Sequence, residues 1–408
     1  MQIGTQLFIG AQERKDFSIA QIRQRIASAK QFVNLQRLMI WADDDPEVYQ
    51  NIIPICQEYE VETYLWFPVL ADIPGYDVQE NALVTSYADK RGYGKIGRWE
   101  QLGAGDEKFL FICPNNTPEL KKVFQLYKNL IDNVDFDGVF LDRIRYPSCT
   151  NGFESLFTCF CEFCQEKFSA HYGVSLDSVR QTIAGFLESL KQITAKELNQ
   201  CESLESFWAS AGLERFFEFR NKNIYDVVKK FSAYAKSKQK HVGLDVYTPS
   251  LAPFVSQNYR LLSQCCDWLK PMSYCHVIGP AGVPLEICCF IQALETLCPN
   301  VSERNLIEFF ERALEIPLPE SKQSILAQGI PEKFVARELE KIRNFRLPDA
   351  IQIYPGIEAV KNPHFALNID RFILEKYLAQ IQPYAPGFIA SWNLLYIPDE
   401  NWEIIGQK

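Results

Sequence analysis

The stretch that decides the fold is PELKKVFQLYKNLIDNVDFDGVFLD, residues 118–142. Residues 118–134 carry apolar side chains at helical spacing, and Pro118 suits the first position of a helix that Thr117 can cap. Residues 137–142 form a short apolar run that ends in an aspartate, as a buried strand can. A helix followed closely by a buried strand is the repeating unit of a parallel α/β protein.

The same alternation of strand-like and helical patterns extends along the whole chain. The strand-like runs are TQLFIGA (5–11), RLMIWA (37–42), ETYLWFPVL (62–70), DGVFLD (137–142), HVGLDVY (241–247), DWLKPMSY (267–274), AIQIYPGIE (350–358) and GFIASWN (387–393). Eight such units predict an α/β fold of the closed (β/α)₈ or TIM-barrel type. We expect a single domain over residues 1–408, with a long excursion after the third strand, which contains RGYGKIGRW and FLFI. We also expect a helical insertion after the fourth strand, at about 175–237.

The composition describes a protein with a large apolar core. Of its 408 residues, 47% are hydrophobic and 23% are charged, and the formal net charge is -9. This charge argues against a nucleic acid or an anionic membrane surface as the main partner. The sequence lacks an apolar run of about 18 residues, and its N-terminus has no secretory pattern, so we expect a cytoplasmic protein. The sequence does not determine the oligomeric state, and a homo-oligomer is one possibility.

The residues at the predicted strand ends indicate what chemistry such a barrel could perform, because barrel enzymes place their sites there. These residues are Trp41, Asp43, Asp44, Trp66, Asp142, Arg143, Arg145, Asp245, Tyr247, Tyr274, His276, Glu358, Trp392 and Asn393. Carboxylates and aromatic rings dominate, which suits sugars: rings stack on pyranose faces, and carboxylates cleave the acetal. Trp41 and Trp66 could equally be core aromatics. With four histidines in the chain, a catalytic zinc site is not expected.

The segment DFDGVFLDRIRYPS (135–148) resembles the D-G-[IV]-x-L-D-x-x-R-[YF]-P signature of glycosidase-like TIM-barrel proteins. CPNNTPE before it, and DWLKPMSY and GFIASWN after it, agree with this resemblance, which spans residues from about 110 to 395. Those families are largely uncharacterised, so the resemblance implies a fold and a general class of enzyme. Chitinase-type chemistry is disfavoured, because D-x-x-D-x-D-x-E would need Asp and Glu where Phe140 and Ile144 stand.

Four cysteines form a second pattern: Cys113 in CPNNTPEL, and Cys159, Cys161 and Cys164 in CFCEFCQEKF. Their spacing resembles the zinc site of the β-galactosidases of glycoside hydrolase family 42, which implies one structural Zn²⁺ and no organic cofactor. That family has Asn-Glu at the end of strand four where this chain has Leu141-Asp142, so its activity is not carried over. Four thiolates close a zinc tetrahedron without a position for water. Four reduced thiols, or Cys149 in place of Cys113, are the alternatives.

Asp142 is the first candidate catalytic residue, a nucleophile or a base that neighbouring arginines would hold ionised. Its partner is predicted to be Glu358, because many retaining barrel glycosidases that resemble this chain carry their pair on strands four and seven. Asp245 is the alternative partner, and Glu358 could instead be a solvated charge. We expect substrate contacts from Arg145, Tyr274, Trp392, Asn393 and Trp66.

The sequence therefore predicts a glycoside hydrolase that cleaves an oligosaccharide or a small glycoside. A carbohydrate-binding protein without turnover is the alternative from another class, and a transglycosidase or lyase in the same pocket is a third. Hydrolysis needs two carboxyl groups about 5–5.5 Å apart for retention of configuration, or roughly 6.5–9.5 Å apart for inversion. A binding protein does not need such a pair.

Overall fold

The computed structural model describes residues 1–92, 109–201, 203–362 and 367–407. Within these ranges, eight parallel strands close into a barrel, which confirms the predicted TIM-barrel fold. The strands are β1 (Gln2–Leu7), β2 (Leu35–Trp41), β3 (Glu62–Pro68), β4 (Gly138–Asp142), β5 (His241–Tyr247), β6 (Trp268–Met272), the pair β7 (Gln352–Ile353) and β8 (Gly356–Glu358), and β11 (Gly387–Ser391). β1 pairs with both β2 and β11, and β6 pairs with β5, β7 and β8, so the ring is complete.

The seventh strand of the barrel is interrupted between β7 and β8. Pro355 lies in this gap, and a proline has no backbone N–H to donate to a neighbouring strand. A short hairpin, β9 (Lys361–Asn362) and β10 (Leu367–Asn368), follows the barrel strand. The predicted strand-like run FLFI forms no strand, because only Ile112 makes a bridge, to Leu83. Most of the segment RGYGKIGRW lies outside the described residues.

Helices surround the strands. They are α1 (Glu13–Asp16), α2 (Ile19–Phe32), α3 (Pro46–Glu58), α4 (Thr117–Asn133), α5 (Glu162–Tyr172), α6 (Leu176–Leu190), α7 (Ala195–Leu198), α8 (Leu204–Ala209), α9 (Glu214–Ser237), α10 (Tyr259–Leu262), α11 (Val283–Leu297), α12 (Glu303–Leu314), α13 (Lys322–Gln328), α14 (Lys333–Asn344), α15 (Arg371–Ile381) and α16 (Asp399–Gly406). The predicted cap of α4 was wrong by one residue. Asn116 is the cap, because its side chain accepts a hydrogen bond from the N–H of Glu119, and Thr117 is already helical.

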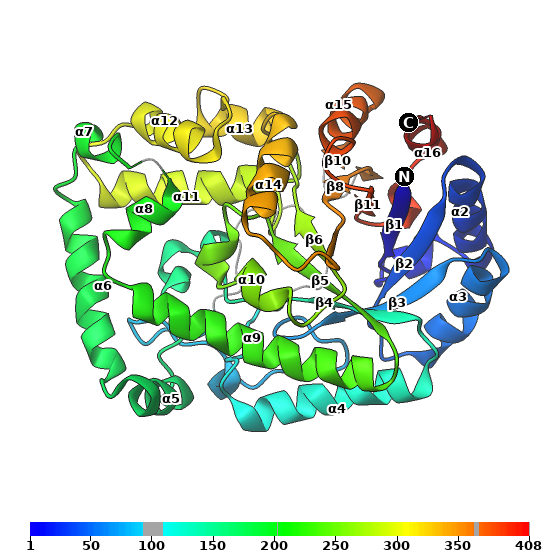
Figure 1. Ribbon diagram of the computed structural model, residues 1–408, viewed down its shortest axis with the longest axis horizontal. Helices are drawn as coiled ribbons and strands as arrows, with labels where there is room; N and C mark the ends of the chain where they lie inside the picture. Colours follow the sequence, from blue (N-terminus) through cyan, green and yellow to red (C-terminus); the bar gives the residue numbers. More distant parts are fainter. Residues whose placement is uncertain (93–108, 202, 363–366, 408) are drawn as a thin grey trace.

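The predicted insertion at about 175–237 is helical, but its last helix belongs to the barrel. α9 packs against β4, β5 and α4, which makes it the crossover helix between the fourth and fifth strands. Figure 1 shows α6, α7, α8 and α11 gathered on the left, on the side where α9 begins, with the barrel strands to the right. Because a crossover helix begins near the C-terminal end of the preceding strand, this helical lobe lies at the C-terminal end of the barrel.

Large side chains, most of them aromatic, fill the barrel interior below the C-terminal ends of the strands. Met39, Trp41, Tyr64, Trp66, Phe140, Trp268, Tyr354 and Ile389 form this inner cluster. Glycines make room for it, because a Cβ added at Gly243 would lie 2.2 Å from the ring of Trp268. Phe140 and Trp268 stack at 5.1 Å between ring centroids. The inner cluster is therefore a packed floor beneath the C-terminal ends of the strands.

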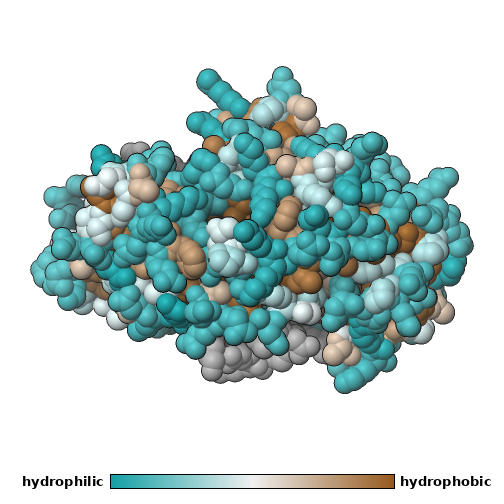
Figure 2. Space-filling view, turned by 90° about the horizontal axis from the view of Figure 1, so that it is seen from below, coloured by the Kyte–Doolittle hydropathy of each residue, from teal (hydrophilic) through white to brown (hydrophobic). Residues whose placement is uncertain are grey.

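The face in Figure 2 is mostly hydrophilic, and its hydrophobic residues show singly or in small groups. Among the helices of the described ranges, none combines the length and the apolar character needed to cross a bilayer.

Candidate functional site

A layer of polar side chains lies on top of the aromatic floor of the barrel. Its members are Gln6 of β1, Asp142 of β4, Asp245 of β5, Lys270 of β6, Tyr274 just after β6, and Ser391 of β11, and we call this set the polar layer. All of them are buried. Five strands thus direct polar groups into the end of the barrel where enzymes of this fold perform their chemistry.

The strand register brings two predicted carboxylates together. Leu141 of β4 pairs with Leu244 of β5, so that Asp142 and Asp245 follow side by side on neighbouring strands. Asp245 in turn pairs with Lys270 of β6. Paired residues of parallel strands point to the same side of a sheet, and the two carboxylates therefore share the barrel interior.

Asp142 is held by hydrogen bonds from two N–H groups, and its residue is 7% exposed. The indole Nε1 of Trp66 donates to Oδ2 at 2.9 Å, and the backbone N–H of Arg143 donates to Oδ1. The ring of Trp66 meets that of Trp41 edge to face, at 4.7 Å between centroids. Trp66 is therefore both a core aromatic, as one reading expected, and a direct partner of Asp142.

Asp245 is 2% exposed, and its two oxygens have different surroundings. Oδ2 accepts a hydrogen bond from Nζ of Lys270 at 3.1 Å, whereas Oδ1 has no hydrogen-bond partner within the described residues. Burial raises the pKa of Asp245 to about 7, the charge of Lys270 opposes this rise, and the charge of Asp142 adds to it. A carboxyl group with such a pKa can carry a proton near neutral pH.

Lys270 connects the members of the polar layer. Its Nζ donates to Gln6 Oε1 at 3.0 Å and to the hydroxyl of Tyr274 at 2.7 Å, in addition to Asp245. The Tyr274 hydroxyl donates to Ser391 Oγ at 3.1 Å, and Ser391 Oγ donates to Gln6 Oε1 at 3.0 Å. Sequence reasoning missed Lys270, Gln6 and Ser391. The signal for Lys270 was present, since a charged residue stands inside the apolar run of DWLKPM.

Two predicted substrate-binding aromatics, one of them a member of the polar layer, stack on each other. The rings of Tyr274 and Trp392 stack with their centroids 6.2 Å apart and an angle of 22° between their planes. Tyr274 is buried, and Trp392 is half-buried. Tyr274 is linked to Asp245 through Lys270, so the stacked pair is connected to the carboxylate by hydrogen bonds.

Glu358 occupies a different environment from the one predicted for a catalytic acid. Oε1 accepts from the backbone N–H groups of His276 and Val277, at 2.7 and 2.9 Å. Oε2 accepts from the N–H of Cys275 at 3.2 Å and from the hydroxyl of Tyr377 on α15. The residue is 0% exposed, so it is not a solvated charge either. These contacts fasten the loop after β6 to α15 and do not favour proton transfer to a substrate.

Arg145 and Asn393 are also engaged with the protein itself. The guanidinium of Arg145 lies between the rings of Phe111 and Tyr247, 4.6 and 4.7 Å from their centroids. The amide of Asn393 donates to the carbonyl oxygen of Phe8 at 2.9 Å and accepts from the N–H of Leu395 at 3.2 Å. Both side chains shape the loops around the barrel end, and their predicted substrate contacts stay predictions.

Arg143 follows Asp142, and its charge acts on Asp245. Its charge lowers the pKa of Asp245, against the larger effect of burial. The guanidinium lies 4.2 Å from the ring centroid of Phe109 and 3.7 Å from Asp72 Oδ2. Because these groups surround the end of β4, the segment after β3 borders the polar layer.

The four predicted cysteine ligands meet in space. Cys113, Cys159, Cys161 and Cys164 are buried, and their sulfur atoms all lie within 4.8 Å of one another, close enough to hold a metal ion. Sγ of Cys113 is 3.4 Å from that of Cys161 and 3.5 Å from that of Cys164. A tetrahedral zinc with bonds of about 2.3 Å would separate its sulfurs by about 3.8 Å. We call this group the cysteine cluster.

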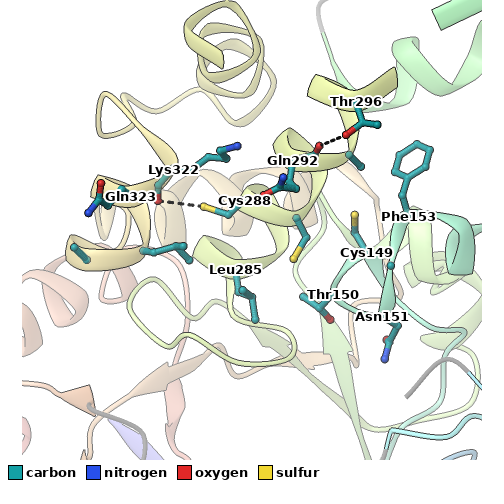
Figure 3. A pocket seen from close by; sticks show the side chains of 15 residues that line it. Cys149, Thr150, Asn151, Phe153, Leu285, Cys288, Gln292, Thr296, Lys322 and Gln323 are labelled. Carbon is teal, nitrogen blue, oxygen red and sulfur yellow. Dashed lines mark hydrogen bonds between the residues drawn. The ribbon is translucent and has the colours of Figure 1, made fainter. Parts of the chain in front are cut away.

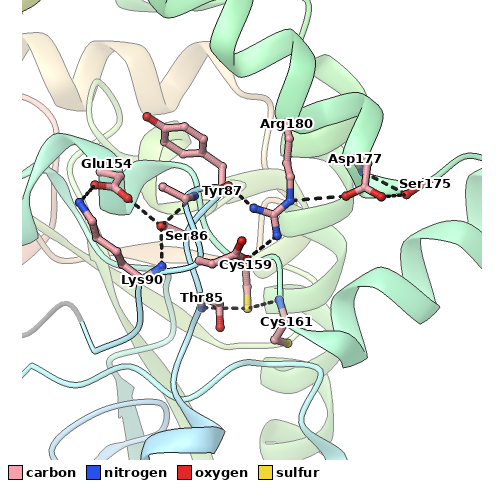
Figure 4. A network of polar contacts seen from close by, with 12 residues as sticks. Thr85, Ser86, Tyr87, Lys90, Glu154, Cys159, Cys161, Ser175, Asp177 and Arg180 are labelled. Carbon is pink, nitrogen blue, oxygen red and sulfur yellow. Dashed lines mark hydrogen bonds and ion pairs between the residues drawn. The ribbon is translucent and has the colours of Figure 1, made fainter.

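N–H groups surround the sulfurs of the cysteine cluster, as they do in metal–thiolate sites. The backbone N–H of Thr85 donates to Cys159 Sγ at 3.3 Å, and the side-chain amide of Asn115 donates to Cys164 Sγ at 3.2 Å. Figure 4 shows Thr85, Cys159 and Cys161 beside a network of polar contacts that extends to Arg180. Arg220, a buried arginine nearby, has its pKa lowered to about 10 by burial, while the charges of Tyr146, Cys159 and Cys164 oppose this.

The cysteine cluster joins segments that are far apart in the sequence. Thr85 belongs to the excursion after β3, and Cys161 precedes α5. In the same region, Lys90 pairs with Glu154 at 2.9 Å (Figure 4). Arg180 of α6 pairs with Asp89 at 2.7 Å. The cluster and these ion pairs fasten the excursion to the helical lobe.

Cys149 lies elsewhere, in a groove with a volume of about 960 Å³. Figure 3 shows Cys149 and Thr150 facing α11 and α13 across this groove, with Cys288 and Lys322 on the opposite side. Because the cluster contains Cys113 and does not contain Cys149, the alternative in which Cys149 replaces Cys113 is wrong.

Comparison with known proteins finds similarity in structure and none in sequence. No protein-family model and no curated protein matches the sequence. The glycoside hydrolase domain of PgaB (BpsB) from Bordetella bronchiseptica is similar in structure, with 12% identity and a TM-score of 0.55, over 100% of this chain and 96% of that one. An alpha-L-fucosidase from Paenibacillus thiaminolyticus gives a TM-score of 0.48 at 12% identity, over 100% of this chain and 48% of that one. The GH18 chitinase ChiB of Flavobacterium johnsoniae gives 0.43 at 11% identity, over 99% and 92%.

Proposed function

We propose that this protein is a glycoside hydrolase whose carboxylate pair is Asp142 and Asp245. The observation that carries the proposal is the placement of these two residues side by side, on adjacent strands at the C-terminal end of the barrel. Their environments differ: Asp142 accepts two hydrogen bonds from N–H groups, and burial raises the pKa of Asp245 to about 7. Acetal hydrolysis requires one carboxyl group that donates a proton and a second that acts as nucleophile or base.

The two residues take different roles in this mechanism. Asp245 carries a proton near neutral pH and donates it to the leaving-group oxygen through Oδ1, the oxygen that has no partner among the described residues. Asp142, whose oxygens accept hydrogen bonds from Trp66 and from the backbone of Arg143, acts as the nucleophile or as the base that activates water. This assignment replaces Glu358, our first choice from sequence, by Asp245, because Glu358 already accepts four hydrogen bonds from the protein.

The aromatic residues around the pair support a carbohydrate as the substrate. Trp66 is anchored to Asp142, and Tyr274 stacks with the half-buried Trp392. Ring faces beside carboxylates complement the C–H faces and hydroxyl groups of a pyranose. The PgaB domain that shares this fold carries the name of a glycoside hydrolase, in agreement with the proposal.

A screen with a broad panel of aryl and oligosaccharide glycosides tests the proposal. We expect turnover of at least one glycoside by the wild-type protein and its loss in Asp142→Asn, with product stereochemistry followed by NMR. Asp43→Asn is a matched control, since Asp43 is paired with Arg14 at 2.6 Å on the rim. Binding of glycans without turnover of any panel member would instead indicate a carbohydrate-binding protein.

We further propose that the cysteine cluster holds one structural Zn²⁺, bound by Cys113, Cys159, Cys161 and Cys164. The support is the close approach of four buried sulfurs, a donor set that zinc prefers. With all four positions taken by thiolates, the ion would stabilise the loops and would not activate water. No step of the proposed hydrolysis depends on it.

A further inference from the structure

Lys270 is a fully buried lysine whose hydrogen-bonding capacity is completely used. It is 0% exposed, and an ammonium group has three N–H donors. Three acceptors surround Nζ: Tyr274 Oη at 2.7 Å, Gln6 Oε1 at 3.0 Å and Asp245 Oδ2 at 3.1 Å. A buried charge is retained only when it is paired and bonded in this way, and the sequence supplies each partner from a different part of the barrel end.

These bonds fix Lys270 in a closed ring. Lys270 donates to Gln6 and to Tyr274, Tyr274 donates to Ser391, and Ser391 returns to Gln6. Asp245 is attached to this ring through Oδ2 alone, and its Oδ1 is left without a protein partner among the described residues. The Nε2 of Gln6 likewise lacks an acceptor there. An acceptor and a donor without partners thus flank one ammonium group.

We infer that Lys270 is a positioning residue for Asp245: it binds Oδ2, fixes the plane of the carboxyl group and leaves Oδ1 as the oxygen that meets the substrate. The inference rests on the proposed function and adds to it the reason why one of two equivalent oxygens reacts. Through Tyr274, the same lysine joins the orientation of the carboxyl group to the stacked ring of Trp392. The side chain of Lys270 then orients both the carboxyl group of Asp245 and the aromatic pair on which a sugar would stack.

Lys270 also opposes the effects of burial and of the Asp142 charge on the pKa of Asp245. Burial and the charge of Asp142 on β4 raise the pKa of Asp245, while Lys270 on β6 and Arg143 after β4 lower it. Tyr259 of α10 and Tyr274 are the neighbouring tyrosines, and their hydroxyl groups stay neutral because burial raises their pKa values. Removing Lys270 therefore leaves Asp245 with a higher pKa, and removing the charge of Asp142 leaves it with a lower one.

The test is a pH titration of the aspartate side-chain carbons by ¹³C NMR in the full chain, with the Asp245 signal assigned by its absence in Asp245→Asn. We expect Lys270→Met to move the Asp245 midpoint up by about one pH unit or more, and Asp142→Asn to move it down. Lys240→Met is the matched control, because it breaks the pair of Lys240 with Asp135, 2.9 Å apart on the surface. An Asp245 midpoint that is the same in Lys270→Met and in Lys240→Met would overturn the inference.

Lys270→Gln is the second variant, and it serves if Lys270→Met does not fold, since glutamine keeps a donor for Oδ2 without the charge. It too should raise the midpoint, and an unchanged midpoint would count against the inference. Once a substrate is known, both variants should lower kcat more than they raise KM and should shift the pH–rate profile in step with the NMR midpoint. A shifted midpoint in a protein without glycosidase activity would reject the proposed function and leave the Lys270–Asp245 coupling intact.

Discussion

The polar layer of the barrel and the cysteine cluster are both buried sets of polar side chains, and they differ in how their atoms are partnered. In the cysteine cluster, four sulfurs converge within 4.8 Å and accept hydrogen bonds from surrounding N–H groups. In the polar layer, Lys270 is fully bonded, yet Asp245 Oδ1 and Gln6 Nε2 have no partner among the described residues. A set of polar atoms that are all partnered within the protein suits a structural role. Buried polar atoms without a partner instead indicate a place for a ligand.

Glu358 resembles the cysteine cluster in being fully partnered, although it lies at the same end of the barrel as Asp245. Both carboxylates are buried at the ends of strands, but the oxygens of Glu358 accept hydrogen bonds from three backbone N–H groups and one tyrosine. Burial alone therefore does not identify a catalytic acid. What distinguishes Asp245 from Glu358 is the number of acceptor positions on the carboxyl group that the protein leaves unoccupied.

The largest expected effect is on stability, at the cysteine cluster. Cys161→Ser should abolish metal binding and lower the free energy of unfolding by several kcal/mol, since structural zinc supplies about 10–16 kcal/mol in zinc-finger peptides. Cys56→Ser, at a buried cysteine of α3 outside the cluster, should lower it far less. Chemical denaturation and elemental analysis of untagged protein measure both. Fully folded, metal-free wild-type protein with four readily alkylated thiols would contradict the zinc assignment.

The next effect is on catalysis, with little change in stability. Asp142→Asn should reduce kcat by about 1,000-fold or more, because it removes the nucleophile or base and leaves the fold intact. Steady-state kinetics and a thermal melt measure the two quantities side by side. Wild-type turnover in the folded variant would remove Asp142 from the mechanism. The polar layer would then lack the catalytic role that distinguishes it from the cysteine cluster.

A third effect concerns pH. The pKa of Asp245 is raised to about 7 in the folded state, so its favourable contribution to stability is present below its unfolded pKa and is lost as the pH rises through about 7. Asp245→Asn should therefore gain stability relative to the wild type between about pH 4 and pH 7. Urea unfolding at a series of pH values measures this difference. A difference that does not change with pH would show that Asp245 is ionised in the folded protein throughout.

The smallest effect is expected at Glu358. Glu358→Gln exchanges a charged acceptor for an amide that also carries donors, and it should lower the free energy of unfolding by about 1.5–3 kcal/mol. Its kcat should stay within a few-fold of the wild type, because the loop after β6 is held by other contacts as well, such as that of Ile330 N–H with the carbonyl oxygen of Cys275. Large loss of kcat without loss of stability would reverse this placement.

Much of the fold could be predicted from the sequence because it depends on local patterns. Alternating strand-like and helical runs gave the eight strands, and the strand-end rule pointed to Asp142, Asp245 and Tyr274. The spacing of Cys113 from the later cysteines likewise predicted their meeting. The choice between Glu358 and Asp245 could not be made in this way, because it depends on which N–H groups the folded loops direct at each carboxylate. Lys270 was missed because its partners lie on two other strands, Gln6 on β1 and Asp245 on β5, and on one loop, Tyr274.

The most direct test of the central claim compares two leaving groups in two variants. Asp245→Asn and Glu358→Gln would each be assayed on an activated aryl glycoside and on a glycoside with a poor leaving group. If Asp245 is the acid, its loss should reduce kcat/KM for the poor leaving group by about 100-fold or more and should affect the activated one far less, while Glu358→Gln treats both alike. The reverse pattern, with the leaving-group dependence in Glu358→Gln and not in Asp245→Asn, would contradict the account.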